Sequence, residues 1–138
     1  MPVTKGIKAL CAEAEAEITT LTPEDAIAKH GDPDTVFVDI RDVRELWREG
    51  GVPNAVHAPR GMLEFWVDPE SPYHKELFAS GKSFVFFCAG GLRSALATKA
   101  VQDMGLENVS HVAGGFGKWR ELGGPVEPVP QPPPKPQS

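Results

Sequence analysis

Residues 84–94 read Phe-Val-Phe-Phe-Cys-Ala-Gly-Gly-Leu-Arg-Ser and include the longest uninterrupted apolar run of the chain, Phe84 to Ala89. The four residues before the cysteine have the pattern of a strand that is buried on both faces. Residues 94–104 then favour a helix, which Gly105 ends. A buried strand, a glycine-containing loop and a helix in this order predict an α/β fold, with Cys88 at the carboxyl end of a central strand.

The rest of the chain repeats this alternation of strands and helices. The clearest helix start is Thr22, a candidate N-cap followed by Pro23 at the first helical position, and Gly31 marks the end. We expect a mostly parallel central sheet flanked by helices. The strands are predicted at residues 35–40, 56–58, 84–87 and 109–112, and the helices at 5–17, 22–31, 43–49, 71–80, 94–104 and 116–122.

Length and proline distribution predict one domain with two appendages. A chain of 138 residues suffices for one hydrophobic core but is short for two. Seven of its 14 prolines lie in residues 125–138, where missing N–H groups and fixed φ angles disfavour helix and sheet. We therefore expect an N-terminal helical extension over residues 1–17, a domain over 18–124, and a disordered, extended and mobile Pro-rich tail over 125–138.

Composition argues against several classes of function. The net charge is −5 without any Lys/Arg cluster, so nucleic acid is not an expected partner. The apolar runs are far shorter than a membrane span and the N-terminus lacks a secretory pattern, so we expect no membrane partner and a cytoplasmic location. Two cysteines make no disulfide framework and the four histidines lack metal-ligand spacing, so neither a metal nor another cofactor is expected.

The loop after the strongest strand carries the candidate chemistry, centred on Cys88. Gly90 and Gly91 leave room for backbone N–H groups to face inward, Ser94 is a candidate cap of the following helix, and Arg93 adds a positive charge. Each of these features favours a thiolate over a thiol, so the pattern predicts a reactive cysteine. The alternative is a buried structural thiol, which has no need of the Gly-Gly and Arg residues around it.

Four short motifs follow one another along the chain: Asp39-Ile40-Arg41, Gly50–Ala55 leading to His57–Gly61, Cys88–Ser94, and Gly114–Phe116 before Trp119. In order and spacing they resemble the signatures of rhodanese-like sulfurtransferase domains over about residues 18–124. The resemblance implies a three-layer α/β domain in which Cys88 takes a sulfane sulfur from a small anionic donor such as thiosulfate. The resulting persulfide passes the sulfur to cyanide or a thiol, or to an acceptor protein. Gly51 and Asn54 depart from the usual residues of one turn, which affects only the shape of that turn.

Chemistry and the resemblance together suggest roles for the residues around Cys88. Arg93 is expected to hold the anionic donor, and the N–H groups of the loop to bind the outer sulfur. Arg60 is a candidate second anion contact, with a solvated surface group as the alternative. The loop residues are Ala89, Gly90, Gly91, Leu92, Arg93 and Ser94.

Four other residues have less direct roles in the prediction. Asp39, Arg41 and Glu45 are interpreted as structural, with Arg41 and Glu45 forming an exposed pair four residues apart. Cys11 in the first helix is a candidate resolving thiol.

Loop length distinguishes sulfur transfer from a second enzyme class. Cys-dependent phosphatases and arsenate reductases of related fold place an Arg six residues after the cysteine, whereas Arg93 is five residues after Cys88. A loop one residue shorter suits one outer sulfur and is cramped for a tetrahedral oxyanion. A catalytically silent binding module typically lacks the cysteine, and a dedicated sulfur carrier differs only in its partner. The favoured prediction is a sulfurtransferase.

Overall fold

The computed structural model describes residues 2–134, and within them five parallel strands form one sheet in the order β1-β5-β4-β2-β3. The strands are β1 (Thr19–Leu21), β2 (Thr35–Asp39), β3 (Val56–His57), β4 (Ser83–Phe87) and β5 (Val109–Val112). The α-helices are α1 (Ile7–Glu15), α2 (Pro23–Lys29), α3 (Val43–Glu49), α4 (Leu63–Val67), α5 (Leu92–Asp103) and α6 (Gly115–Glu121), with short 3-10 helices η1 (Arg60–Met62) and η2 (Glu76–Ala79). The predicted α/β fold with a parallel central sheet is confirmed.

Strand β4 lies at the centre of the sheet because β2 and β5 pair with its two edges. Phe87 is level with Asp39 of β2, and Phe86 is level with His111 of β5. The strands are parallel, so their carboxyl ends meet at the same edge of the sheet. The residue after β4, Cys88, is therefore flanked by the loops that follow β2 and β5.

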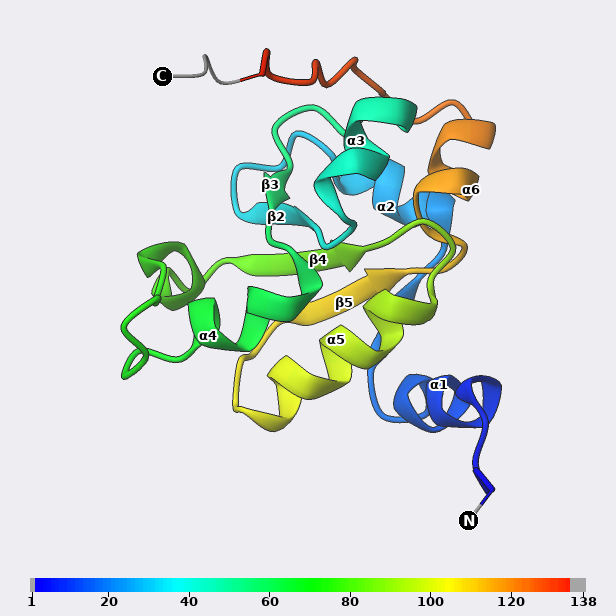
Figure 1. Cartoon of the computed structure of the whole chain (residues 1–138), viewed down its shortest axis with the longest axis vertical. Coiled ribbons are helices and arrows are strands. Elements are labelled where there is room, and N and C mark those ends of the chain that lie inside the picture. Colours follow the sequence, from blue (N-terminus) through cyan, green and yellow to red (C-terminus); the bar gives the residue numbers. More distant parts are fainter. Residues whose placement is uncertain (1, 135–138) are drawn as a thin grey trace.

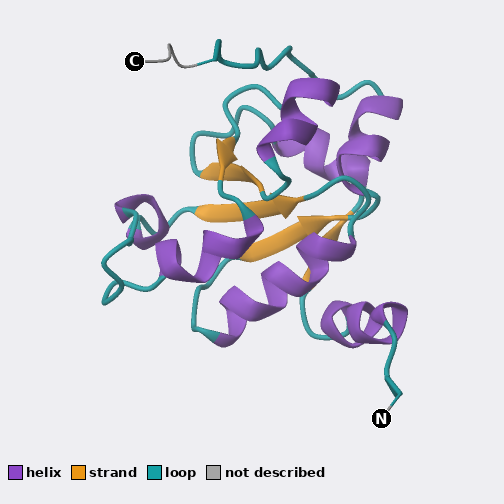
Figure 2. Ribbon diagram, in the orientation of Figure 1, coloured by secondary structure: helices purple, strands orange, loops and turns teal. Residues whose placement is uncertain are grey.

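Alternating side chains of the strands build a core on each face of the sheet. Phe84 and Phe86 pack in one core with residues of α4 and α5, and Val85 and Phe87 pack in the other with residues of α2 and α6. Figures 1 and 2 show these helix layers on opposite sides of the strands, with α3 beside α2 and α6. The two apolar faces account for the nearly continuous hydrophobicity of β4 in the sequence.

Helix α1 adds a small third cluster outside the α5 layer. Cys11 and Ala14 of α1 are buried against Ala95 of α5, and Cys11 Sγ lies 3.5 Å from the carbonyl oxygen of Leu92. Figure 1 shows α1 beside the beginning of α5. The N-terminal helix thus contacts the region where the Cys88 loop enters α5. The proposed boundary between residues 17 and 18 stays a prediction.

Most sequence-predicted elements are present, and helix caps explain their positions. The Thr22 side chain accepts a hydrogen bond from the N–H of Asp25, and Asp42 and Glu45 form a capping box at the start of α3. The sequence pattern predicts neither strand β1 nor helix α4, because both are too short to show a periodic alternation of apolar residues.

The helix predicted over residues 71–80 is wrong. Its first residues form turns, and only the 3-10 helix η2 is present. Asp68 and Ser71 side chains accept backbone N–H groups two residues later, which favours turns over helix. Proline at positions 69 and 72 adds to this local bias.

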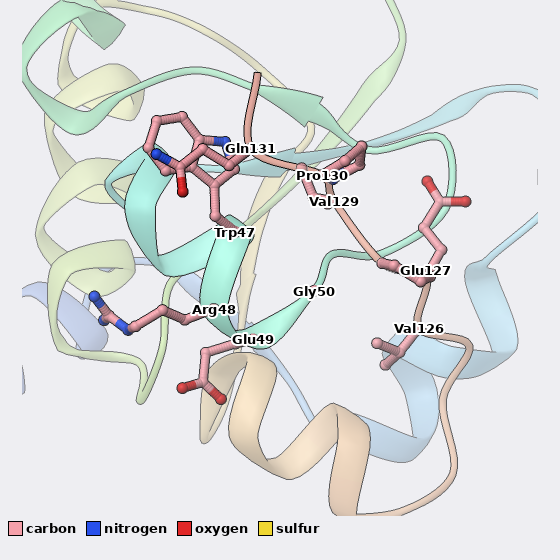
Figure 3. A pocket seen from close by; sticks show the side chains of 10 residues that line it. Trp47, Arg48, Glu49, Gly50, Val126, Glu127, Val129, Pro130 and Gln131 are labelled. Carbon is pink, nitrogen blue, oxygen red and sulfur yellow. The ribbon is translucent and has the colours of Figure 1, made fainter. Parts of the chain in front are cut away.

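The first residues of the Pro-rich tail, 125–131, contact the domain, whereas an extended and mobile segment was expected; for the rest of the tail the expectation stays a prediction. Glu127 and Gly51 exchange two backbone hydrogen bonds of 2.8 and 2.9 Å in an antiparallel bridge. Trp119 Nε1 donates to the carbonyl oxygen of Pro125 at 2.7 Å. Figure 3 shows the tail passing beside α3. Between them lies an open hollow of about 500 Å³, lined by Trp47, Arg48, Glu49, Gly50 and Val126 to Gln131. The last four residues of the predicted tail lie outside the described residues.

Candidate functional site

The sulfur of Cys88 is buried at the carboxyl end of β4 and is surrounded by polar hydrogens. It accepts hydrogen bonds from the backbone N–H groups of Gly91 at 3.1 Å and Ser94 at 3.4 Å. The Ser94 hydroxyl lies 3.6 Å from Sγ. Donors aimed at a sulfur atom stabilise its anionic form. The structure therefore places these donors around Cys88, a residue that is only 1% exposed.

Gly91 gives the loop its turn into α5. Its φ angle of +103° lies in the left-handed region, and an added Cβ would lie 3.3 Å from the backbone nitrogen of Gly114. The helix begins at Leu92 with Gly91 as its N-cap. Glycine is therefore required here both for the backbone angle and for the close approach of the next loop.

The predicted capping role of Ser94 is wrong. Ser94 lies in the first turn of α5, and no side chain caps that helix. Its hydroxyl instead lies 3.4 Å from the carbonyl oxygen of Gly91 and 2.9 Å from Nδ1 of His111. The helix starts two residues earlier than predicted because Gly91 provides the turn, which turns the Ser94 side chain toward Cys88.

Further N–H groups of the loop are available to an anion. Within residues 2–134, the N–H groups of Ala89, Gly90, Leu92 and Arg93 have no hydrogen-bond acceptor. Ala89, Gly90 and Leu92 are exposed, so the loop lies at the surface above the buried sulfur. The positive end of the 12-residue helix α5 lies at the same place. The loop can thus hold a negative atom placed outside Sγ.

Backbone hydrogen bonds join the first residues of α6 to the Cys88 loop. The carbonyl oxygens of Cys88 and Ala89 accept hydrogen bonds from Phe116 at 2.8 Å and Gly117 at 3.1 Å. Gly115 has a φ angle of +58°, and an added Cβ would lie 2.4 Å from the Cys88 oxygen. The Gly114-Gly115-Phe116 motif therefore sets the position of the Cys88 backbone.

Arg93 is bound to Glu45 of α3. Its two terminal nitrogens donate to the two carboxylate oxygens at 2.8 and 3.0 Å. This pairing is the main cause that raises the pKa of Arg93, and Cys88 acts in the same direction more weakly. The same ion pair lowers the pKa of Glu45. The Arg93 side chain is 42% exposed, so an anion from solvent can reach it.

The predicted exposed pair of Arg41 and Glu45 is wrong. Arg41 is buried and forms a salt bridge of 2.7 Å with Asp39, and it also donates to the carbonyl oxygen of Gly50. Its guanidinium carbon lies 4.1 Å from the centre of the Phe116 ring. A buried pair with these additional contacts fixes the loop after β2 against α6. The structural role of Asp39 and Arg41 fits their positions, while Glu45 faces the other way, toward Arg93.

Arg60 lies on η1 and bonds Glu64 of α4 at 2.6 Å, four residues later. No hydrogen bond or ion pair joins it to residues 88–94 in the described chain. Its role as a second anion contact stays a prediction.

Sequence reasoning missed two partners of the loop, Glu45 and His111. Glu45 is 48 residues from Arg93, and His111 is 17 residues from Ser94. Only the packing of α3 and β5 beside the loop brings them there. Over residues 2–134 no cluster of three or more His, Cys, Asp or Glu residues could hold a metal ion. Among the same residues no helix is long and apolar enough to cross a membrane.

Comparison with known proteins agrees with the fold. The family model described as Rhodanese-like domain matches residues 22–122. A polysulfide-sulfur transferase homodimer from Wolinella succinogenes is 32% identical, with a TM-score of 0.67, and the match covers 88% of this chain and 87% of that one. A solved protein from Rhodopseudomonas palustris, described as of unknown function and a possible tyrosine phosphatase, is 58% identical with a TM-score of 0.89, over 92% of this chain and 98% of that one.

Curated relatives are longer proteins. The tRNA uridine(34) hydroxylase of Mesorhizobium japonicum is 33% identical over 122 residues, which are 86% of this chain and 37% of that protein. In the corresponding enzyme of Pectobacterium carotovorum the match covers 23% of the length. The chain thus spans between 23% and 37% of these two relatives.

Proposed function

This chain belongs to the rhodanese-like domain family, and on that premise we propose that it is a sulfurtransferase that carries sulfur as a persulfide of Cys88. The observation that carries the proposal is the arrangement around Sγ. Two N–H groups bond the sulfur, and four more N–H groups of the exposed loop have no acceptor in the described chain. A persulfide adds one negatively charged sulfur just outside Sγ, where these groups lie.

The reaction has two displacement steps. The Cys88 thiolate attacks the outer sulfur of thiosulfate, a new S–S bond forms, and sulfite leaves with the electrons of the broken bond. Cyanide or a thiolate then attacks the outer sulfur of the persulfide, and the Cys88 thiolate leaves. Each step conserves charge, and the cysteine ends in its starting form. The two cysteines are free thiols, which fits a reducing, cytoplasmic location.

Arg93 is the group that we assign to the anionic donor. Its side chain is 42% exposed. Glu45 accepts one hydrogen bond from each terminal nitrogen, so the donor must share the guanidinium with Glu45 and use the remaining N–H groups. We expect Arg93 to contribute to binding of the donor more than to the displacement itself.

Two relatives bear on the substrate. The Wolinella relative transfers polysulfide sulfur, which is the chemical class proposed here. The match to the tRNA hydroxylase of Mesorhizobium japonicum covers 37% of that protein, and a net charge of −5 does not favour binding to the phosphates of tRNA. We therefore propose a small sulfur anion as donor and cyanide or a thiol as acceptor, an acceptor protein being the variant of the same chemistry.

Phosphate hydrolysis is the second candidate, because the Rhodopseudomonas relative is described as a possible tyrosine phosphatase. The loop argues against it. Gly91 and Ser94 already direct their N–H groups to Sγ itself, and only four residues separate Cys88 from Arg93. The free N–H groups of so short a loop are cramped around a phosphoryl group, whose three oxygens must all meet donors at once; each unpaired charged oxygen costs about 1 to 3 kcal/mol or more.

Mass spectrometry of the intact protein tests the proposal. Thiosulfate treatment should add one sulfur atom to the wild type and to Cys11→Ser, and nothing to Cys88→Ser. Cyanide should then remove the added sulfur as thiocyanate. An adduct that survives in Cys88→Ser, or no adduct in the wild type, contradicts the assignment.

Activity on aryl phosphates separates the two candidate functions. The same preparation is assayed for thiocyanate formation and for aryl phosphate hydrolysis. We expect Cys88-dependent sulfur transfer and no Cys88-dependent hydrolysis. Hydrolysis of comparable efficiency that is lost in Cys88→Ser would favour the phosphatase.

A further inference from the structure

A chain of polar groups leads from Cys88 through the interior to the surface beside α1. The Ser94 hydroxyl lies 3.6 Å from Cys88 Sγ and 2.9 Å from His111 Nδ1. The other ring nitrogen, Nε2, lies 3.2 Å from the hydroxyl of Thr20 and 3.8 Å from the carboxylate of Glu15. Ser94 and His111 are fully buried, whereas Thr20 and Glu15 are exposed. The chain of groups therefore joins the buried sulfur to exposed residues of α1 and β1.

Both hydroxyls and the imidazole ring can reverse their hydrogen bonds. With a protonated thiol, S–H donates to Ser94 Oγ, Ser94 O–H donates to Nδ1, and Nε2–H donates to Thr20. With a thiolate, the order reverses: His111 Nδ1–H donates to Ser94, and Ser94 O–H donates to the sulfur. Only a neutral imidazole has one donor and one acceptor nitrogen, as this reversal requires.

We propose that Ser94 and His111 form a switchable hydrogen-bond chain that carries the Cys88 thiol proton to the surface and leaves the Ser94 hydroxyl as a third donor to the thiolate. One proton moves from Sγ to Ser94, one from Ser94 to Nδ1, and one from Nε2 to water beside Thr20 and Glu15. The protein loses one proton in total, and His111 is neutral before and after. His111 is a positioning residue, because it acts on the sulfur only through Ser94.

The surroundings of His111 fit a ring that stays neutral. Burial lowers the pKa of His111, and the carboxylate of Glu15 opposes this effect more weakly. Helix α1 carries Glu15 and the Cys11 thiol, and burial is also the main cause that raises the pKa of Cys11. Strand β1 contributes only the hydroxyl of Thr20, and the charge of Arg93 on α5 is paired with Glu45.

The proposal gives the second half of the loop a purpose beyond substrate binding. It rests on the proposed function only in that a sulfurtransferase uses the thiolate. Its test needs no sulfur donor, so it can fail while sulfur transfer is observed, or succeed while sulfur transfer is not.

Alkylation of Cys88 by iodoacetamide as a function of pH measures the thiolate directly, with the modified site read by peptide mass. Ser94→Ala removes the third donor to the thiolate, so the midpoint of the alkylation profile should rise by about one pH unit. At a fixed pH below the midpoint, the fraction of Cys88 present as thiolate should then be about tenfold lower. His111→Leu should give a rise of similar size. The double variant should equal either single variant, since both act through one hydroxyl.

Two further variants distinguish positioning from a general structural effect. His111→Asn keeps an amide near the place of Nδ1 and should return the midpoint close to that of the wild type. Thr98→Ala is the matched control, because Thr98 is a buried hydroxyl one turn later on the same helix whose oxygen has no partner in the described chain. It should leave the midpoint unchanged. Additive shifts in the double variant, or equal shifts in His111→Asn and His111→Leu, contradict the proposal.

Nitrogen NMR of the intact wild type supplies a test that requires no variant. The ¹⁵N shifts of His111 should report hydrogen on Nε2 below the Cys88 alkylation midpoint and hydrogen on Nδ1 above it, with the exchange centred on that midpoint. A ring that keeps one tautomer throughout, or one that becomes doubly protonated at the midpoint, overturns the inference.

Discussion

Arg93 of α5 and Glu45 of α3 join the first turns of two helices through two hydrogen bonds between guanidinium and carboxylate. Arg93 places a positive charge at the positive end of α5, which is unfavourable by itself, and Glu45 compensates it. Glu45 also accepts the N–H of Asp42 as part of the capping box of α3. One carboxylate therefore both completes a helix start and limits the charge that an incoming anion meets.

Substitution of Glu45 should strengthen donor binding. Glu45→Gln keeps a side chain that can complete the capping box, but it removes the counter-ion of Arg93. Arg93 should then attract thiosulfate more strongly, by about 1 kcal/mol at this partly exposed site, so the KM for thiosulfate should fall several-fold. Arg93→Ala should raise KM, with a smaller change in kcat. Steady-state kinetics at constant ionic strength measure both.

Glu49→Gln is the control for the charge change, because Glu49 pairs with Arg120 on the surface. It should leave KM unchanged. Equal KM values in all variants would show that Arg93 does not meet the donor.

Acid should weaken the same ion pair. The pKa of Glu45 is lowered in the folded protein, mainly by Arg93. The stabilisation is therefore fully present above the unfolded-state pKa of about 4.3 and is lost as pH falls through the lower folded-state value. At neutral pH Glu45→Gln should lower Tm by about 2–4 °C, since a half-exposed pair contributes about 1 kcal/mol at most. The difference from wild type should shrink toward zero near pH 3; a constant difference across pH would point to an effect unrelated to ionisation.

Gly115→Ala should disable the cysteine loop. The added methyl group would lie 2.4 Å from the Cys88 oxygen, so the loop or the start of α6 must move. We expect persulfide formation to fall at least tenfold, which corresponds to a loss of about 1.4 kcal/mol. Gly123→Ala has the same left-handed strain, at φ +84°, but nothing within 4 Å of the new Cβ. A similar loss of activity in both variants would assign the effect to backbone strain alone.

Removal of the docked tail segment should cost stability. A chain ending at Gly124 loses the Trp119–Pro125 hydrogen bond and the Gly51–Glu127 bridge, so Tm should fall by about 3–8 °C. A chain ending at Gln131 keeps both and should have the wild-type Tm in differential scanning calorimetry. Equal Tm values for both truncations would mean that the tail contributes nothing to stability.

The sequence predicts local features well because caps, glycines and apolar runs act over a few residues. The helix start at Thr22, the central strand and the cysteine after it are of this kind. Contacts between distant segments leave no such signal in the sequence. The spacing of Arg41 and Glu45 predicts an ion pair between them, but Arg41 is buried with Asp39, and Glu45 pairs with Arg93 instead. His111 is likewise an ordinary strand residue in the sequence, and its role follows from the pairing of β5 with β4.

The edge position of β1 has a consequence for biosynthesis. β1 is made early, yet the strand that it pairs with is β5, with Thr19 opposite Ser110. β2 and β4 can pair on a nascent chain while β5 is still inside the ribosome. Strand β1 and the face of α1 that carries Cys11 must wait for most of the chain to be translated before they find their partners. Premature release before Val112 would therefore leave an unpaired β4 edge, a site for aggregation and a binding surface for chaperones.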